Sequence, residues 1–243
     1  GVYPTLRGAG GGGAGFGGGV ELDIDRLLKL PEPLAGLGLH ARALASFNAY
    51  QHYGGGFRID GILLPDAYIS GDISYMDLPE EDFFGIGPDT SLGGGTTYRQ
   101  RETRYMIRAG NAFTDTLSGE FTFAYQDIRI SDGKDGGKDP IKEIYVPRGL
   151  NGTDGADLMS ETVSLAHDTR DNKSNPSRGG YEKMSVGYYN SAGGPFEYFK
   201  YRADIARFIP VYKNRIVIAL RASAEFNDSV GGSPMPFFGI SRL

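Results

Sequence analysis

The amino-acid sequence predicts an all-β fold of antiparallel, up-and-down strands, and three observations indicate it. Apolar and polar residues alternate with a period of two along most of the chain, as in the segment RIVIALRASAEF at 215–226. Successive side chains leave a strand on opposite faces, so this period is typical of strands. Segments with a helical period are almost absent, and connections rich in Gly, Pro, Asp and Asn separate the alternating segments.

About ten segments show the alternation, and each is long enough for a strand. In order along the chain, the predicted strands are 16–25, 37–47, 57–63, 68–75, 104–109, 120–125, 162–166, 182–188, 199–205 and 215–226. Residues 26–34 suggest a short helical turn, which Pro31 and Pro33 limit because proline removes a backbone donor.

Connections of different length alternate along the chain. Those at 77–95 and 131–158 are long, whereas those at 65–67, 114–119 and 211–214 are short. A meander with one trimmed end and one ragged end has this property, and outer-membrane barrels pair short periplasmic turns with long external loops. A soluble sandwich has no reason to keep the alternation.

Composition excludes several classes of protein. The chain has 243 residues, enough for one large β-domain, and contains no Cys, so disulfides and thiolate metal sites are excluded. The formal net charge is -5 and no basic run follows a phosphate backbone, so we expect no nucleic-acid partner. No window approaches eighteen consecutive apolar residues, which excludes a transmembrane helix.

The period alone leaves the environment of each face open. Charged residues occur in the middle of the predicted strands, as at Arg104, Arg202 and Arg221. In a soluble protein these charges would cover the outer, wet face of an ordinary core. In a wide membrane barrel they would line a water-filled interior, and the apolar residues would face lipid.

Several short motifs of the C-terminal half are shared with one family. The chain reads DTRDNKSNPSRGGYEKMSVGYY from Asp168, continues into a strand that ends in Pro-Val at a tight turn, and later reads GGSPMPFFGI. Together with FFGIGPDTS at 83–91, these elements resemble the barrel domain of the bacterial surface antigen family, the superfamily of BamA and TamA. The turn motif that carries the resemblance consists of Asp168, Arg170, Asp171, Pro176 and Gly179.

The resemblance implies an antiparallel up-and-down transmembrane β-barrel in the outer membrane of a diderm bacterium. We expect residues 1–243 to form one barrel domain that holds about ten strands of a sixteen-stranded barrel. The family's Arg-Gly-aromatic tripeptide does not occur before Leu243. The domain is therefore expected to be incomplete at its C-terminus, with the chain stopping within a long extracellular loop.

The resemblance also assigns the two faces of the predicted strands. The residues expected to face the lumen are Arg104, Arg108, Lys200, Arg202, Asp204, Arg221 and Glu225. The residues expected to face lipid are Phe199, Tyr201, Ile205, Ile216, Ile218, Leu220 and Phe226.

The function that the resemblance implies is non-covalent: outer-membrane protein assembly or polypeptide translocation through a weak seam and an inward-folded loop. The implied partners are outer-membrane lipids and client polypeptides. We expect no cofactor, no metal and no catalytic residue. GAGFGG at 13–18 lacks the flanking strand and helix of a dinucleotide site, and no G-x-S-x-G nucleophile is present. Two alternatives are the membrane anchor of a larger protein, such as a patatin-like phospholipase, and a soluble β-protein.

Overall fold

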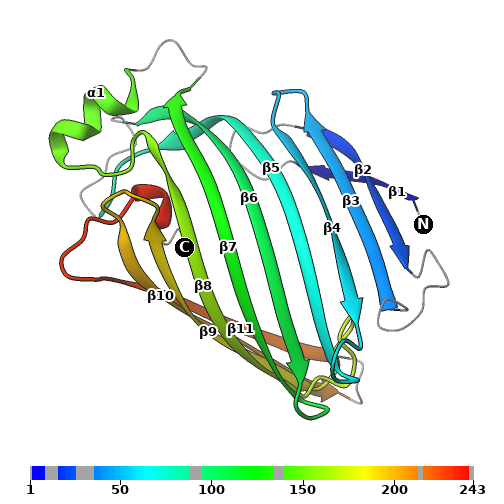
Figure 1. The fold of residues 1–243 in the computed structure, drawn as a ribbon. Helices are drawn as coiled ribbons and strands as arrows, with labels where there is room; N and C mark the ends of the chain where they lie inside the picture. The colour runs from blue at the N-terminus through cyan, green and yellow to red at the C-terminus, as the bar shows by residue number, and fades with distance from the viewer. Residues whose placement is uncertain are drawn as a thin grey trace.

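Eleven strands form one antiparallel sheet in the order of the sequence (Figure 1). The computed structural model describes residues 2–8, 16–25, 36–87, 95–133, 139–212 and 216–240. The strands are β1 (Val2–Gly8), β2 (Phe16–Asp25), β3 (Leu37–Ser46), β4 (Gln51–Asp60), β5 (Ala67–Phe83), β6 (Thr96–Ala112), β7 (Leu117–Asp132), β8 (Gly155–Asp168), β9 (Gly179–Ser191), β10 (Glu197–Tyr212) and β11 (Ile216–Ser229).

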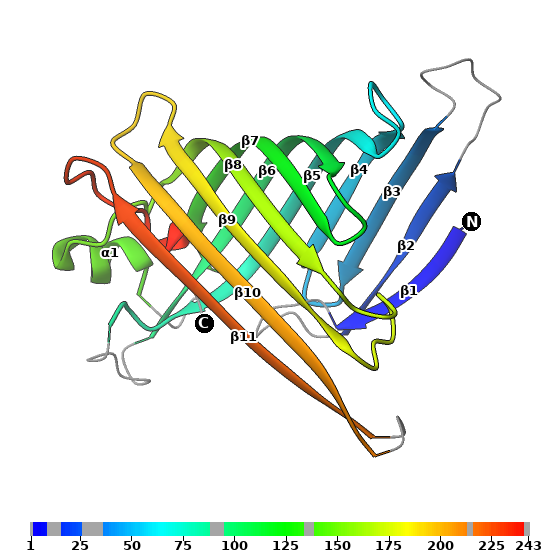
Figure 2. The same ribbon diagram turned by 90° about the horizontal axis from the view of Figure 1, so that it is seen from below.

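The sheet curves into an open trough whose edge strands are β1 and β11 (Figure 2). Within the described residues these two strands do not pair with each other. The predicted all-β, up-and-down antiparallel fold is therefore confirmed, with one more strand than the predicted ten. The additional strand is β1, and its sequence VYPTLRG alternates only over its short length before a run of glycines.

Two strand boundaries differ from the prediction. The fourth strand covers Gln51–Asp60, not 57–63, because Gly54, Gly55 and Gly56 have no side chains to display a period. The fifth strand continues to Phe83, although the sequence indicated an end near Tyr75. The register between β5 and β6 shifts between Leu78 and Glu81, and this irregularity accommodates Pro79, which cannot donate to the ladder.

The connections lie at two ends of the sheet, which we call the loop end and the turn end. At the loop end β3 is followed by β4, β5 by β6, β7 by β8 and β9 by β10, and at the turn end β4 is followed by β5, β6 by β7, β8 by β9 and β10 by β11. As predicted, the connections 84–95 and 133–154 are longer than the connections that precede and follow them along the chain. The predicted alternation is reversed at 169–178, which is longer than 192–196.

Three short helices lie at the loop end of the part that the structure describes. The connection between β7 and β8 contains α1 (Ile141–Tyr145) and the 3-10 helix η3 (Val146–Arg148), and a second 3-10 helix, η4 (Phe237–Gly239), follows β11. Across the described ranges, no helix combines the length and the apolarity needed to cross a membrane. The helical turn predicted at 26–34 lies outside the described residues.

Candidate functional site

Regular pairing sorts the side chains of the sheet onto two faces. In one row of directly paired residues, Lys200 on β10 is followed by Gly187 on β9, Thr162 on β8, Thr122 on β7 and Arg108 on β6. Directly paired residues project to the same side of a sheet. The face that contains this row is called the polar face below, and the opposite one the apolar face.

The structure places the seven residues predicted to face a lumen together on the polar face. By register and alternation, the polar face carries Arg104, Arg108, Lys200, Arg202, Asp204, Arg221 and Glu225. The seven residues predicted to face lipid are together on the apolar face: Phe199, Tyr201, Ile205, Ile216, Ile218, Leu220 and Phe226.

Ion pairs connect neighbouring strands across the polar face. Arg202 donates from Nε to Oε2 of Glu225 over 2.8 Å, and Nζ of Lys200 lies 3.0 Å from the other carboxylate oxygen. Nε of Arg221 donates to Oδ1 of Asp204 over 3.2 Å. Each of these pairs joins β10 to β11, so the charges of the two strands largely compensate one another.

Two carboxylates that the sequence prediction did not assign complete the network. Glu102 accepts from Nε of Arg104 and from Nε2 of Gln126, both over 3.0 Å. Oδ2 of Asp72 lies 3.2 Å from Arg108. An acidic residue two positions before an arginine of the same strand, as Glu102 stands before Arg104, is the sequence signal that could have indicated the first of these pairs.

The polar face encloses a hollow of about 670 Å³ on the concave side of the trough. Residues from six consecutive strands, β6 to β11, line it, among them Arg108, Glu120, Thr162, Lys183, Arg202 and Arg221. The charged and hydroxyl side chains of one curved face therefore converge on a shared hollow. No cluster of three or more potential metal ligands occurs in the described ranges.

The predicted turn motif lies in the connection between β8 and β9 at the turn end. Arg170 donates to both carboxylate oxygens of Asp168, over 2.9 and 2.8 Å, and its guanidinium lies 4.9 Å from the ring centroid of Tyr181. Asp171 accepts from the backbone N–H groups of Ser177 and Arg178. The hydroxyl of Ser177 also donates to Asp171, and these hydrogen bonds lower the pKa of the Asp171 carboxyl to about 2.

The last residues of the motif set the geometry of the return into β9. Gly179 has a φ of 92°, a left-handed conformation that favours glycine, and an added Cβ would collide with the carbonyl oxygen of Thr169. Pro176, which lies between Asp171 and Gly179 in this turn, is half-buried. The motif thus forms a self-capped turn whose polar groups satisfy one another.

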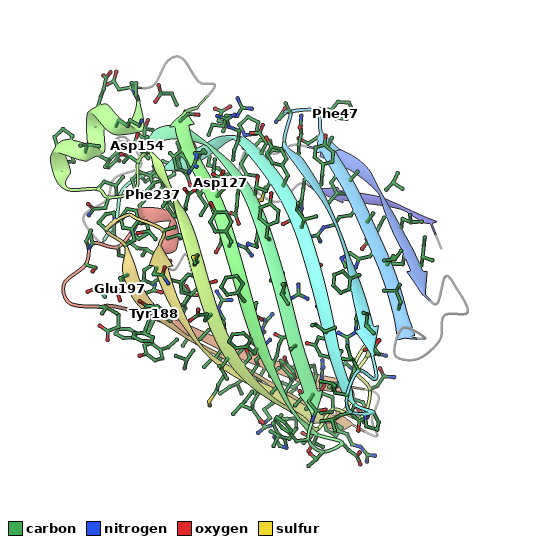
Figure 3. The ribbon with its side chains drawn as sticks, viewed as in Figure 1. Phe47, Asp127, Asp154, Tyr188, Glu197 and Phe237 are labelled. Atoms are coloured by element: carbon green, nitrogen blue, oxygen red, sulfur yellow. The ribbon has the colours of Figure 1, made fainter. Side chains whose placement is uncertain are left out.

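At the loop end, the polar face carries an apolar cluster that the sequence prediction missed. The segment after β11 folds back toward the loop end, where Figure 3 labels Phe237 of η4. Phe237 packs against Phe83 and Tyr98 with ring centroids 5.2 Å apart in both pairs. The ring of Tyr145 of α1 also contacts that of Phe83, with the ring centroids 4.9 Å apart. The buried members of the cluster are Phe83, Tyr98, Ile128, Ile130, Ile141, Tyr145, Leu158, Phe196 and Phe237.

The apolar face remains exposed over β3 to β11. Ile107, Leu220 and Phe226 are 54%, 56% and 64% exposed, values typical of the surface and not of a protein core. Aromatic residues pair near the loop end of this face, with ring centroids 6.4 Å apart for Tyr53 and Tyr75. Further aromatic pairs of the face are Tyr105–Tyr125, Tyr188–Phe199 and Tyr201–Phe226.

Charged groups border the apolar face toward both ends of the strands. Near the loop end, Nε of Arg99 donates to Asp77 over 2.8 Å, and Arg129 lies 2.9 Å from Asp157. Tyr188 donates to Glu197 over 2.6 Å in the same zone. Figure 3 labels both side chains near the loop end. Near the turn end, Glu182 pairs with His167 and Arg207. An apolar band with aromatic and charged borders follows from this arrangement.

An open, twisted antiparallel meander with one polar and one apolar face defines the chain as a β-barrel type of domain. The sequence profile described as the Omp85 superfamily domain matches residues 34–239. Because this match covers most of the chain, the protein belongs to the Omp85 superfamily, which confirms the resemblance to the BamA and TamA group.

A solved structure supports the same fold. The chain is similar to BamA from Haemophilus ducreyi lacking POTRA domains 1-3, with a TM-score of 0.67 and 13% sequence identity. The similarity covers 99% of this chain and 42% of the length of the BamA chain. No curated protein sequence matches the chain significantly.

Proposed function

We propose that the sheet is part of a transmembrane barrel in the bacterial outer membrane, with its apolar face in lipid and its polar face toward an aqueous interior. The observation that carries the proposal is the exposed apolar face, which is continuous over β3 to β11 and bordered by charges. Burying apolar surface is worth about 25 cal/mol per Å², so leaving so many large side chains in water would be costly. A lipid environment would remove all of these side chains from water.

Closure of the barrel is the second part of the proposal. Among the described residues, the outer edges of β1 and β11 pair with no other strand and so present free backbone N–H and C=O groups, which hydrocarbon does not tolerate. We infer that additional strands complete the sheet between these edges, toward the sixteen strands that the family resemblance implies. The match to 42% of a longer BamA chain is consistent with this.

For the activity, we propose non-catalytic assembly of outer-membrane proteins or translocation of polypeptides. Membership of the Omp85 superfamily supports this proposal, together with the segment 230–240 that folds into the concave face. The partners would be outer-membrane lipids and unfolded client polypeptides. The sheet would act by offering a pairing edge and a hydrated, charge-compensated interior, with no covalent step of its own.

The test is the folding of a client into vesicles. The full-length protein is reconstituted into phospholipid vesicles, an unfolded outer-membrane barrel protein is added, and its folding is followed by the change in mobility of the unheated sample on gels. The proposal predicts faster folding than in empty vesicles. Equal rates in both, with the reconstituted protein itself folded, would refute an assembly role; protection of a secreted polypeptide from external protease then tests translocation.

A further inference from the structure

More cations than carboxylates line the hollow on the polar face, which we call the polar-face hollow. Its volume is about 670 Å³, and its lining comes from β6 to β11 and the turn between β8 and β9. The charged residues of this lining are the cations Arg108, Arg170, Lys183, Arg202 and Arg221 and the carboxylates Glu120 and Asp204. Five cations against two carboxylates leave an excess of three positive charges in the lining.

Each of these cations has a carboxylate partner that is less exposed than the cation itself. The side chain of Arg202 is 61% exposed, and that of its partner Glu225 is 13% exposed. Arg221 is 72% exposed, and its partner Asp204 is 21% exposed. The same order holds for the pairs Arg108–Asp72, Arg170–Asp168 and Lys183–Glu120. A molecule that enters the hollow therefore meets the positive end of every pair first.

Arg202 and Arg221 retain hydrogen-bond donors after they have formed their ion pairs. Arg202 uses Nε and one terminal nitrogen on Glu225, and Arg221 uses the same two groups on Asp204. A guanidinium has five N–H groups, so three remain on each side chain. Within the described ranges, no protein acceptor takes these remaining groups. The ion pairs thus hold both guanidiniums in place and leave them able to bind an anion.

The size and the other lining residues favour a polypeptide segment over a single small anion. A volume near 670 Å³ is in the range of sites that hold ligands of drug size. The cations are spread over β6, the turn 169–178, β9, β10 and β11, so one small anion would not contact all of them. The hydroxyls of Thr162 and Ser185 can donate to an anion, and Met106 and Phe208 offer apolar contact.

We propose that the polar-face hollow binds an acidic, extended segment of a polypeptide, with side-chain carboxylates on the guanidiniums of Arg202 and Arg221. This inference rests on the proposed function, because a barrel that handles client polypeptides exposes its aqueous face to them. Guanidinium and carboxylate form two parallel hydrogen bonds, which gives the contact both strength and a defined geometry. The protein would thus retain acidic segments of its clients on the wall formed by β10 and β11.

Binding of short peptides to the full-length protein tests the proposal. The protein is placed in nanodiscs of phosphatidylcholine, a lipid without net charge, and is titrated by calorimetry with hexaglutamate, hexaglutamine and tripolyphosphate. Hexaglutamine has the length of the first peptide without its charge, and tripolyphosphate has the charge without a peptide chain. Hexaglutamate is expected to bind more tightly than the other two. Its affinity should fall as salt is added, because salt screens exposed charges.

Removal of the two guanidiniums should weaken the binding of hexaglutamate. Arg202→Gln combined with Arg221→Gln should raise its dissociation constant about tenfold, the effect of two exposed ion pairs. Arg99→Gln is the matched control and should leave the affinity unchanged, because Arg99 is also an ion-paired arginine but does not line the hollow. Thr162→Asp adds a carboxylate to the lining without removing an ion pair, so it should also weaken binding and decides the matter if the double variant does not fold.

Four outcomes would each refute the proposal. An unchanged affinity for hexaglutamate in the folded double variant or in Thr162→Asp would mean that the peptide binds elsewhere. Equal affinity for hexaglutamine would mean that charge is not recognised, and tighter binding of tripolyphosphate would assign the hollow to an oligophosphate. Absence of hexaglutamate binding would remove the site altogether. The client-folding assay is read separately: tight hexaglutamate binding without faster client folding would refute the assembly role and leave the anion site in place.

Discussion

Replacement of Gly110 by alanine should destabilise the barrel through one tyrosine. Gly110 on β6 pairs directly with Tyr68 on β5 and with Glu120 on β7. The Tyr68 ring extends across the glycine, and its hydroxyl donates to the Glu120 carboxylate two strands away. Arg58 stacks on this ring, with its guanidinium carbon 3.6 Å from the centroid. Only a residue without a side chain leaves room for this bridge.

The size of the effect follows from these contacts. A Cβ at Gly110 would lie 2.5 Å from Cε1 of Tyr68, so the ring must move by about 1 Å to reach ordinary contact distance. Overpacking of this kind costs about 1–3 kcal/mol. The displaced ring would also weaken the hydrogen bond to Glu120 and the stacking of Arg58, which adds about 1 kcal/mol. We expect Gly110→Ala to lower the free energy of unfolding by about 3 kcal/mol.

A double-mutant cycle isolates this mechanism. The free energy of unfolding of the full-length protein is measured by urea titration in micelles, followed by circular dichroism. In a Tyr68→Ala background, Gly110→Ala should cost less than about 0.5 kcal/mol, because the ring that it displaces is gone. Gly55→Ala is the matched control, since no ring covers that strand glycine. An equal cost of Gly110→Ala in both backgrounds would refute the reasoning.

Three further predictions concern other parts of the molecule. Because the folded pKa of Asp171 is about 2, below its unfolded value, its stabilisation of the turn is complete above about pH 4 and is lost as the pH falls toward 2; amide exchange of Ser177 against pH should show this, and the dependence should vanish in Asp171→Ala. Glu161 is exposed on the apolar face opposite Phe123, so Glu161→Leu should raise the free energy of unfolding in bilayers by about 1 kcal/mol; an unchanged free energy would argue against lipid at this position. Phe237→Ala should release the segment 230–240, at a local cost of about 3 kcal/mol, and expose it to limited proteolysis; an unchanged cleavage pattern would contradict its anchoring role.

The two-residue period was sufficient to predict which side chains share a face. Alternation is a geometric property of a strand, so Arg202 and Glu225 on one face, and Tyr201 and Phe226 on the other, follow from position alone. Their direct pairing across β10 and β11 depends on register, which the sequence does not specify without knowledge of the turn. The alternating lengths of the connections, together with the family resemblance, predicted the meander order that the structure confirms.

The features that could not be predicted depend on contacts between distant segments. Tyr98 and Leu158 lie on the polar face although they are apolar, because η4 and α1 cover them at the loop end. Nothing in a local window indicates that a segment more than seventy residues later will bury these side chains. Similarly, the glycines of β4 hide the period, and the extension of β5 depends on pairing with β6 past Pro79.

Accessibility along a single strand tests the central assignment of the two faces most directly. The chain has no cysteine, so single cysteines can be placed at each position from Lys183 to Tyr188 on β9 of the full-length protein in membranes. A spin label at each position reports collisions with a water-soluble nickel complex and with oxygen dissolved in lipid. The account predicts nickel collisions at 183, 185 and 187, and oxygen collisions at 184, 186 and 188. Nickel collisions at 184, 186 and 188 with oxygen collisions at 183, 185 and 187, or equal access to nickel at all six positions, would contradict this prediction.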